Sequence, residues 1–261
     1  MVERESWRDR IEAAPHGVLF VPPVIGLPPP PRRAKVGDQE FVRFMDYILS
    51  PVDTDAVDLN MLSTINSLRL RLVASGFAGS TNGIIKRAFS DFVSHGSHQT
   101  VVDWGCGFDP VNTRMGDPRR IGVDLDPAVV ATQRSAGHEC YLPADPALLQ
   151  YAGGVDAILA AFVFHFRIGT SHIRMMCNLL REDSGVIVAN VYRRSEESRS
   201  RLAESIRAEG LALRTAIDRS NLCRQHEYWM ASKSRSGAEL DILLERLADA
   251  VDRAVSDQRL T

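Results

Sequence analysis

The sequence lacks the features that mark membrane, secreted and nucleic-acid-binding proteins. It has no run of about 18 apolar residues, the length that a membrane-spanning helix requires. The N-terminal residues MVERESWRDRIEAA are charged where a signal peptide would be apolar. The formal net charge is −2, without the basic excess expected of a surface that binds nucleic acid or membrane. These absences predict a cytoplasmic protein with no membrane partner, and they disfavour a nucleic-acid partner.

Cysteine is also scarce, and its spacing excludes the common metal motifs. The four cysteines lie far apart and form neither a CxxC pair nor a Cys/His ligand pattern. We therefore predict reduced thiols and no metal site. The positions are Cys106, Cys140, Cys177 and Cys223.

The chain is long enough for one substantial core and an additional helical layer. It has 261 residues, of which 44% are hydrophobic and 25% charged. Residues 1–37 hold seven of the 13 prolines and predict an extended, proline-rich arm. Residues 38–97 predict a helical cap, 98–235 an α/β core, and 236–261 a C-terminal amphipathic helix. The apolar stripe of the last helix fits either packing on its own domain or a homodimer contact.

Three helices are expected in the cap from apolar residues that recur every three or four positions. Phe41, Phe44, Met45 and Ile48 mark the first helix, which would stop before Pro51. The second would run to Gly76 and the third would end before Gly96.

The stretch Thr100–Pro127, TVVDWGCGFDPVNTRMGDPRRIGVDLDP, organises the core. It predicts a buried strand, a glycine turn and a second strand that ends at Asp124. Glycines after an apolar strand let the backbone approach a ligand, and a carboxylate ending the next strand can accept the hydroxyls of a ribose. The third glycine of the dinucleotide motif is replaced by Asp109-Pro110, and a carboxylate there would repel a pyrophosphate. The pattern favours an adenosine with a cationic, amino-acid-like tail.

The segments VVDWGCG and GVDLDP resemble the first two motifs of class I S-adenosylmethionine-dependent methyltransferases. The resemblance implies an α/β, Rossmann-like seven-stranded sheet of order 3-2-1-4-5-7-6, with strand 7 antiparallel and a helical N-terminal extension. Residues 98–235 would be the core that binds S-adenosyl-L-methionine, with S-adenosyl-L-homocysteine as product. The segments LALRTAID and EYWMASKS resemble its sixth and seventh strands.

The resemblance also implies a set of cofactor-binding residues. Asp103 and the glycine turn would face the methionine part, and Asp124 would hold the ribose. Asp145 would lie near the adenine amino group, or would only cap the helix that follows it. The full set is Asp103, Gly105, Cys106, Gly107, Asp124, Leu125, Asp145 and Phe162.

The reaction site should border the end of the fourth predicted strand, VDAILAAFVFHF, because ligands gather at the carboxyl ends of parallel strands. This segment lacks the Asn/Asp-Pro-Pro-aromatic motif of amide N-methyltransferases and is similar to the ending found in small-molecule enzymes. A general base is needed only if the acceptor must lose a proton. The candidates are His165, His226 and Tyr192; His165 fits a core or pocket-lining position equally well. The predicted substrate-binding residues are Phe164, Arg167, Arg193 and Tyr228.

Together these patterns predict methyl transfer to a small-molecule acceptor by in-line displacement, in specialised metabolism. Arginines at the rim would suit an anionic acceptor, since a guanidinium binds carboxylate or phosphate in a bidentate manner. Two alternatives stay open at this point. One is a ribosomal or transfer RNA methyltransferase, and the other is a protein that binds the cofactor without transferring a methyl group.

Overall fold

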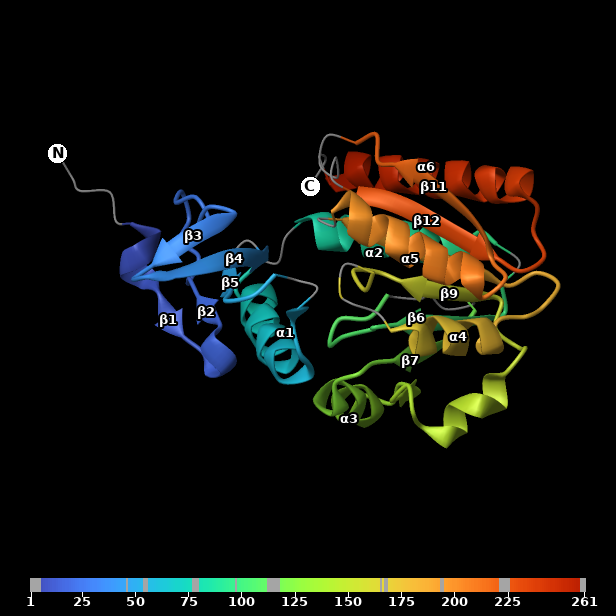
Figure 1. Ribbon diagram of the computed structural model, residues 1–261, viewed down its shortest axis with the longest axis horizontal. Coiled ribbons are helices and arrows are strands. Elements are labelled where there is room, and N and C mark those ends of the chain that lie inside the picture. The colour runs from blue at the N-terminus through green and yellow to red at the C-terminus, as the bar shows by residue number, and fades with distance from the viewer. Residues whose placement is uncertain are drawn as a thin grey trace. The chain divides into compact units, whose positions relative to one another are not determined.

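The structure is a computed structural model, and it divides the chain into two compact units, Met1–Gly79 and Ser80–Thr261 (Figure 1). It describes residues 6–45, 47–53, 56–76, 80–96, 98–111, 118–164, 166, 169–192, 195–220 and 226–258. Each unit contains its own sheet.

The first unit contains a five-stranded antiparallel sheet and the helix α1 (Leu59–Ala74). The strand order is β1-β2-β5-β4-β3, and every neighbouring pair is antiparallel. The strands are β1 (Glu12–Ala13), β2 (Leu19–Phe20), β3 (Arg33–Val36), β4 (Gln39–Met45) and β5 (Ile48–Ser50). Strands β2 and β3 come from the predicted proline-rich arm and pair with β5 and β4, so the arm and the beginning of the cap form one sheet. The short 3-10 helix η1 (Trp7–Arg10) precedes β1, and η2 (Pro15–Gly17) lies between β1 and β2.

The helix predicted from Phe41 to Ile48 is wrong, because this segment forms strands β4 and β5. A β-bulge explains the misleading pattern. The register with β5 shifts between Arg43 and Met45, so Phe44 is an additional residue on β4. Phe41 and Phe44 are therefore both buried although they are three positions apart. A bulged strand thus reproduces the spacing of a helix. The other two predicted helices are confirmed as α1 and α2 (Ser80–Ser94).

The second unit contains a seven-stranded sheet with the order β11-β12-β10-β9-β6-β7-β8. Numbered from β6 within this unit, the order is 3-2-1-4-5-7-6, and only β12 runs antiparallel to the rest. The predicted sheet is confirmed. Its strands are β6 (Thr100–Trp104), β7 (Arg119–Val123), β8 (Cys140–Tyr141), β9 (Ala157–Ala160), β10 (Val186–Tyr192), β11 (Ala212–Ile217) and β12 (His226–Ser232).

Helices cover both faces of this sheet, and its central strands are therefore buried on both sides. Alternate side chains of each strand point to opposite faces. Val101, Leu159 and Val188 pack with α2 and α6 (Gly237–Gln258), whereas Val102 and Ile158 pack on the other face. That second face is covered by α4 (Thr170–Leu179) and α5 (Glu196–Ala208), as Figure 1 shows. The 3-10 helix η4 (Pro146–Tyr151) follows β8.

Helix α6 begins at the predicted capping box. Ser236 N donates to Glu239 Oε2 at 2.7 Å, and Glu239 N donates to Ser236 Oγ at 3.3 Å. Its apolar stripe, including Leu240, Leu247 and Val251, is buried in the core of its own unit. None of the helices in the described part of the chain is long and apolar enough to span a membrane.

Candidate functional site

The glycine turn after β6 is shaped by two residues in the left-handed region and is attached to β7. Gly105 has a φ of +71° and Gly107 a φ of +63°, which residues with a Cβ rarely adopt. The amides of Gly105 and Cys106 both donate to Val123 O, at 2.6 and 3.2 Å. A Cβ on Gly105 would lie only 2.4 Å from Val163 Cγ2. Conformation and close packing therefore both require glycine at position 105.

Asp124 lies at the end of β7 and joins this strand to the turn. Its Oδ2 accepts a hydrogen bond from Gly107 N at 2.9 Å, and its Oδ1 accepts one from Asp126 N at 2.9 Å. Burial raises the pKa of the Asp124 carboxyl group, and the two backbone N–H groups oppose that rise. Each oxygen has a second lone pair, so the carboxylate retains acceptor capacity. The neighbouring Leu125 exposes 45% of its surface.

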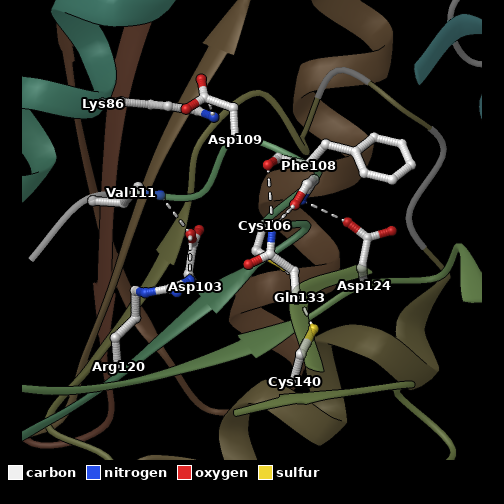
Figure 2. Close-up of polar contacts among 11 residues, drawn as sticks. Lys86, Asp103, Cys106, Phe108, Asp109, Val111, Arg120, Asp124, Gln133 and Cys140 are labelled. Atoms are coloured by element: carbon white, nitrogen blue, oxygen red, sulfur yellow. Dashed lines mark hydrogen bonds and ion pairs between the residues drawn. The ribbon is translucent and has the colours of Figure 1, made fainter. Parts of the chain in front are cut away.

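Asp103, the penultimate residue of β6, supports the segment that follows the glycine turn. Its Oδ2 accepts from Val111 N at 2.8 Å and lies 3.8 Å from Arg120 Nη1. Burial raises the pKa of Asp103, and the charges of Lys86 and Arg120 oppose that rise. Lys86 Nζ also pairs with Asp109 Oδ2 at 3.2 Å. The Asp103 carboxylate is therefore engaged by a backbone N–H group of the segment after the glycine turn (Figure 2).

Gln133, which the sequence interpretation missed, holds the other side of the turn. Its Nε2 donates to Gly107 O at 3.0 Å and to Phe108 O at 3.2 Å, and its side chain is buried (Figure 2). Gln133 comes from α3 (Pro127–Ser135), where it extends the buried stripe of Val129 and Val130. A polar residue on an apolar helical stripe was the signal that could have identified it.

The Cys106 side chain points into the core, and a role of this position beside the cofactor stays a prediction. Its Sγ lies 3.7 Å from Cys140 Sγ, and both side chains pack with α3. The hydrogen bond with Cys140, together with burial, raises the pKa of the Cys106 thiol. The described residues of this cluster thus hold Cys106 as a neutral packing group.

Asp145 takes the capping position that was one of its two predicted roles. Its Oδ1 accepts from Ala147 N at 3.0 Å at the start of η4, and its Oδ2 pairs with Arg134 Nη2 at 3.0 Å. The cap is therefore present, while contact with an adenine stays a prediction.

A second cluster forms where β9 and β10 end and β12 begins, and it brings together three predicted residues. The rings of Tyr192 and His226 stack at 4.7 Å between centroids, with 7° between their planes. The Phe162 ring meets both edge-to-face, at 5.7 Å. Phe162 has a φ of +59°, a conformation that ends β9 before the predicted limit at Phe166. Sequence reasoning therefore placed these side chains at the correct edge of the sheet.

Asn190 joins this cluster from the middle of β10 and was not predicted. It is fully buried; its Oδ1 accepts from Phe162 N at 2.6 Å, and its Nδ2 lies 3.0 Å from His226 Nδ1. An amide within the apolar segment GVIVANVY was a visible signal, since a buried amide requires partners.

Two predicted substrate-binding side chains lie in the core instead. Phe164 follows the early end of β9 and packs on the α4 and α5 face, with 1% of its surface exposed. Tyr228 points from β12 beneath α6, and its hydroxyl donates to Asp218. The remaining candidates, His165, Arg167 and Arg193, lie outside the described residues.

Comparison with known proteins finds similarity in structure only. No family model matches the sequence, and no curated protein matches it. A TehB-like SAM-dependent methyltransferase from Corynebacterium glutamicum is 14% identical, with 67% of this chain and 100% of that chain covered and a TM-score of 0.48.

Two further solved structures are also similar to this chain. The plantazolicin methyltransferase BamL, in complex with a desmethyl analogue and SAH, is 16% identical over 73% of this chain and 84% of that chain, with a TM-score of 0.44. The CMeT domain of citrinin polyketide synthase is 14% identical over 55% of this chain, with a TM-score of 0.43. The match spans 48%, about half, of that second protein. At these identities the likeness to SAM-dependent methyltransferases is one of fold.

Proposed function

We propose that this protein is an S-adenosylmethionine-dependent methyltransferase that acts on a small molecule. The observation that carries the proposal is the hydrogen bond of 2.9 Å from Gly107 N to Asp124 Oδ2. It places a tight glycine turn beside a carboxylate, and the two come from adjacent parallel strands at their carboxyl ends. That edge of an open α/β sheet is where ligands bind.

The residues present suit an adenosyl ligand. Within the described residues each oxygen of Asp124 accepts one hydrogen bond, which leaves one acceptor position on each for the two hydroxyl groups of a ribose. The exposed side chain of Leu125 offers apolar surface next to that carboxylate. The Val163 methyl group fills the space beside Gly105 and the Cys106 side chain packs in the core, so a ligand would meet the backbone of this turn at Gly107.

The charges around the turn favour a cationic tail over a pyrophosphate. Asp109 stands where a dinucleotide site has its third glycine, and 48% of its side chain is exposed. Lys86 offsets part of this charge through its ion pair. A pyrophosphate would meet the Asp109 carboxylate, whereas the ammonium and sulfonium groups of S-adenosylmethionine would be attracted by it.

The bound cofactor would supply a methyl group attached to a good leaving group, so the protein's main task is alignment and exclusion of water. Well-oriented reactants gain roughly 7–11 kcal/mol from alignment alone. The packed rings of Phe162, Tyr192 and His226 offer a rigid, largely apolar boundary at this edge of the sheet.

For the acceptor we propose an anionic small molecule of the kind used in specialised metabolism. The support is the sequence position of two arginines: Arg167 follows the β9 segment, and Arg193 comes directly after β10. Arginine binds carboxylates and phosphates in a bidentate manner. Unchanged affinity for the acceptor in both Arg167→Ala and Arg193→Ala would remove this part of the proposal.

The test of the cofactor is isothermal titration calorimetry with S-adenosylmethionine, S-adenosylhomocysteine and NAD. We expect saturable binding of the first two and none of the dinucleotide. The test of the reaction is release of S-adenosylhomocysteine during incubation with anionic and neutral candidate acceptors. Absence of binding to either adenosyl ligand would contradict the proposal.

A further inference from the structure

The Asn190 side chain lies between two groups of the cluster at the end of β9, and their chemistry fixes its orientation. Phe162 N can only donate, so the atom facing it at 2.6 Å must be the amide oxygen. The amide nitrogen then faces His226 Nδ1 at 3.0 Å. No other orientation of the amide satisfies the backbone donor.

This orientation also fixes the hydrogen on the imidazole ring. An amide nitrogen can only donate, so His226 Nδ1 must accept. A proton on Nδ1 would set two donors against each other in a site where Asn190 is fully buried. The neutral ring therefore carries its proton on Nε2.

We propose that Asn190 is a positioning residue that holds His226 in the Nε2–H tautomer. In this state His226 can contribute a hydrogen-bond donor, but its one basic lone pair is already engaged by Asn190. The inference rests on the proposed function where it concerns catalysis, and it departs from the sequence-based assignment of His226 as a general base.

The surroundings of the ring keep this arrangement rigid. The stacked Tyr192 ring fixes the plane of the imidazole, and Phe162 packs perpendicular to it. The backbone of His226 is held as well, because its carbonyl accepts from Asp218 N at 2.9 Å. Only 6% of the residue is exposed. Exchange between tautomers would require the Asn190 contact to break inside a packed cluster.

The test is long-range proton–nitrogen NMR of the histidine rings in the free, full-length protein. This measurement distinguishes the two tautomers, and the His226 signals are identified by their loss in His226→Gln. We expect the Nε2–H form in the wild type. Asn190→Asp should invert it to the Nδ1–H form, because one carboxylate oxygen can accept from Phe162 N and the other from the ring. Asn178→Asp, an exposed site on α4, makes the same chemical change and should leave the tautomer unchanged.

A wild-type Nδ1–H signal, or an Asn190→Asp spectrum without inversion, would overturn the proposal. If the aspartate variant does not fold, Asn190→Ala supplies the second measurement. It removes the donor and should yield a mixture of both tautomers, whereas an unchanged single tautomer would show that Asn190 does not set it.

Methyl transfer gives an independent readout. Glutamine retains an N–H donor, so His226→Gln should keep a larger share of the wild-type kcat than His226→Ala, which should lower kcat by about tenfold or more. Equal losses in both variants would support a base and contradict the inference. Failure to bind S-adenosylmethionine would instead contradict the proposed function and leave the NMR result in place.

Discussion

Replacing Asp124 with alanine is the sharpest test of the proposed cofactor site. The change removes the acceptor of two backbone N–H groups and, on the proposed function, the acceptor of two ribose hydroxyl groups. A hydrogen bond to a charged group is worth roughly 1.5–3 kcal/mol. Loss of both ribose contacts should therefore cost about 3–6 kcal/mol, or roughly 10²- to 10⁴-fold in Kd.

The difficulty is to separate this loss from damage to the glycine turn. Calorimetry with two ligands, S-adenosylhomocysteine and its 2′,3′-dideoxy analogue, separates the two effects. The wild type should prefer the ligand with both hydroxyl groups, and Asp124→Ala should no longer distinguish the two, because turn damage weakens both ligands alike.

Asp183→Ala is the matched control, since Asp183 is exposed and its Oδ1 accepts only a local bond from Ser184 Oγ at 2.9 Å. It should behave like the wild type. If Asp124→Ala keeps the wild-type preference between the two ligands, Asp124 does not bind the ribose and our assignment of the site is refuted.

Three further predictions concern the turn and its supports. In urea unfolding, Gly105→Ala should lower the stability of the protein more than Gly137→Ala, because both glycines have positive φ but only a Cβ at position 105 collides with a neighbour, the Val163 side chain. Adding Val163→Ala to Gly105→Ala should restore most of the difference. Gln133→Ala should lower the free energy of unfolding by about 1–3 kcal/mol, since the buried Gly107 carbonyl and the part-buried Phe108 carbonyl lose their donor, and an unchanged unfolding midpoint would argue against that support. Burial raises the pKa of Asp103, so its contribution to stability is present below the ordinary carboxyl pKa and is lost as pH rises through the raised value. Asp103→Asn should therefore lose less stability than the wild type over that range, as urea unfolding at a series of pH values would show.

The second unit could be predicted from sequence because its signals are local. A buried strand, a glycine turn and the carboxylate at Asp124 lie within 25 residues, and the strand order follows from the family that this pattern resembles. In the first unit the helix α1 was predicted but the sheet was not, because the bulge at Phe44 gave a strand the apolar spacing of a helix. Which spacing applies depends on pairing with β3 and β5, which a local pattern does not contain.

The site shows the same division between local and tertiary information. Phe162, Tyr192 and His226 lie at one edge of the sheet, as predicted from the expected ends of the strands. The supporting roles of Asn190 and Gln133 depend on partners 25 to 36 positions away, so only the fold reveals them. Tyr228 shares a strand face with His226, but it lies two residues further along β12, where α6 covers it.

The contact between position 105 and the Val163 methyl group means that the protein's own interior already demands this glycine, whether or not any nucleoside is ever bound. A relative without the activity would still lose stability if this glycine were replaced. The carboxylate at 124 meets no such steric demand, but its two backbone hydrogen bonds stabilise the turn, so neither residue alone separates active enzymes from inactive relatives.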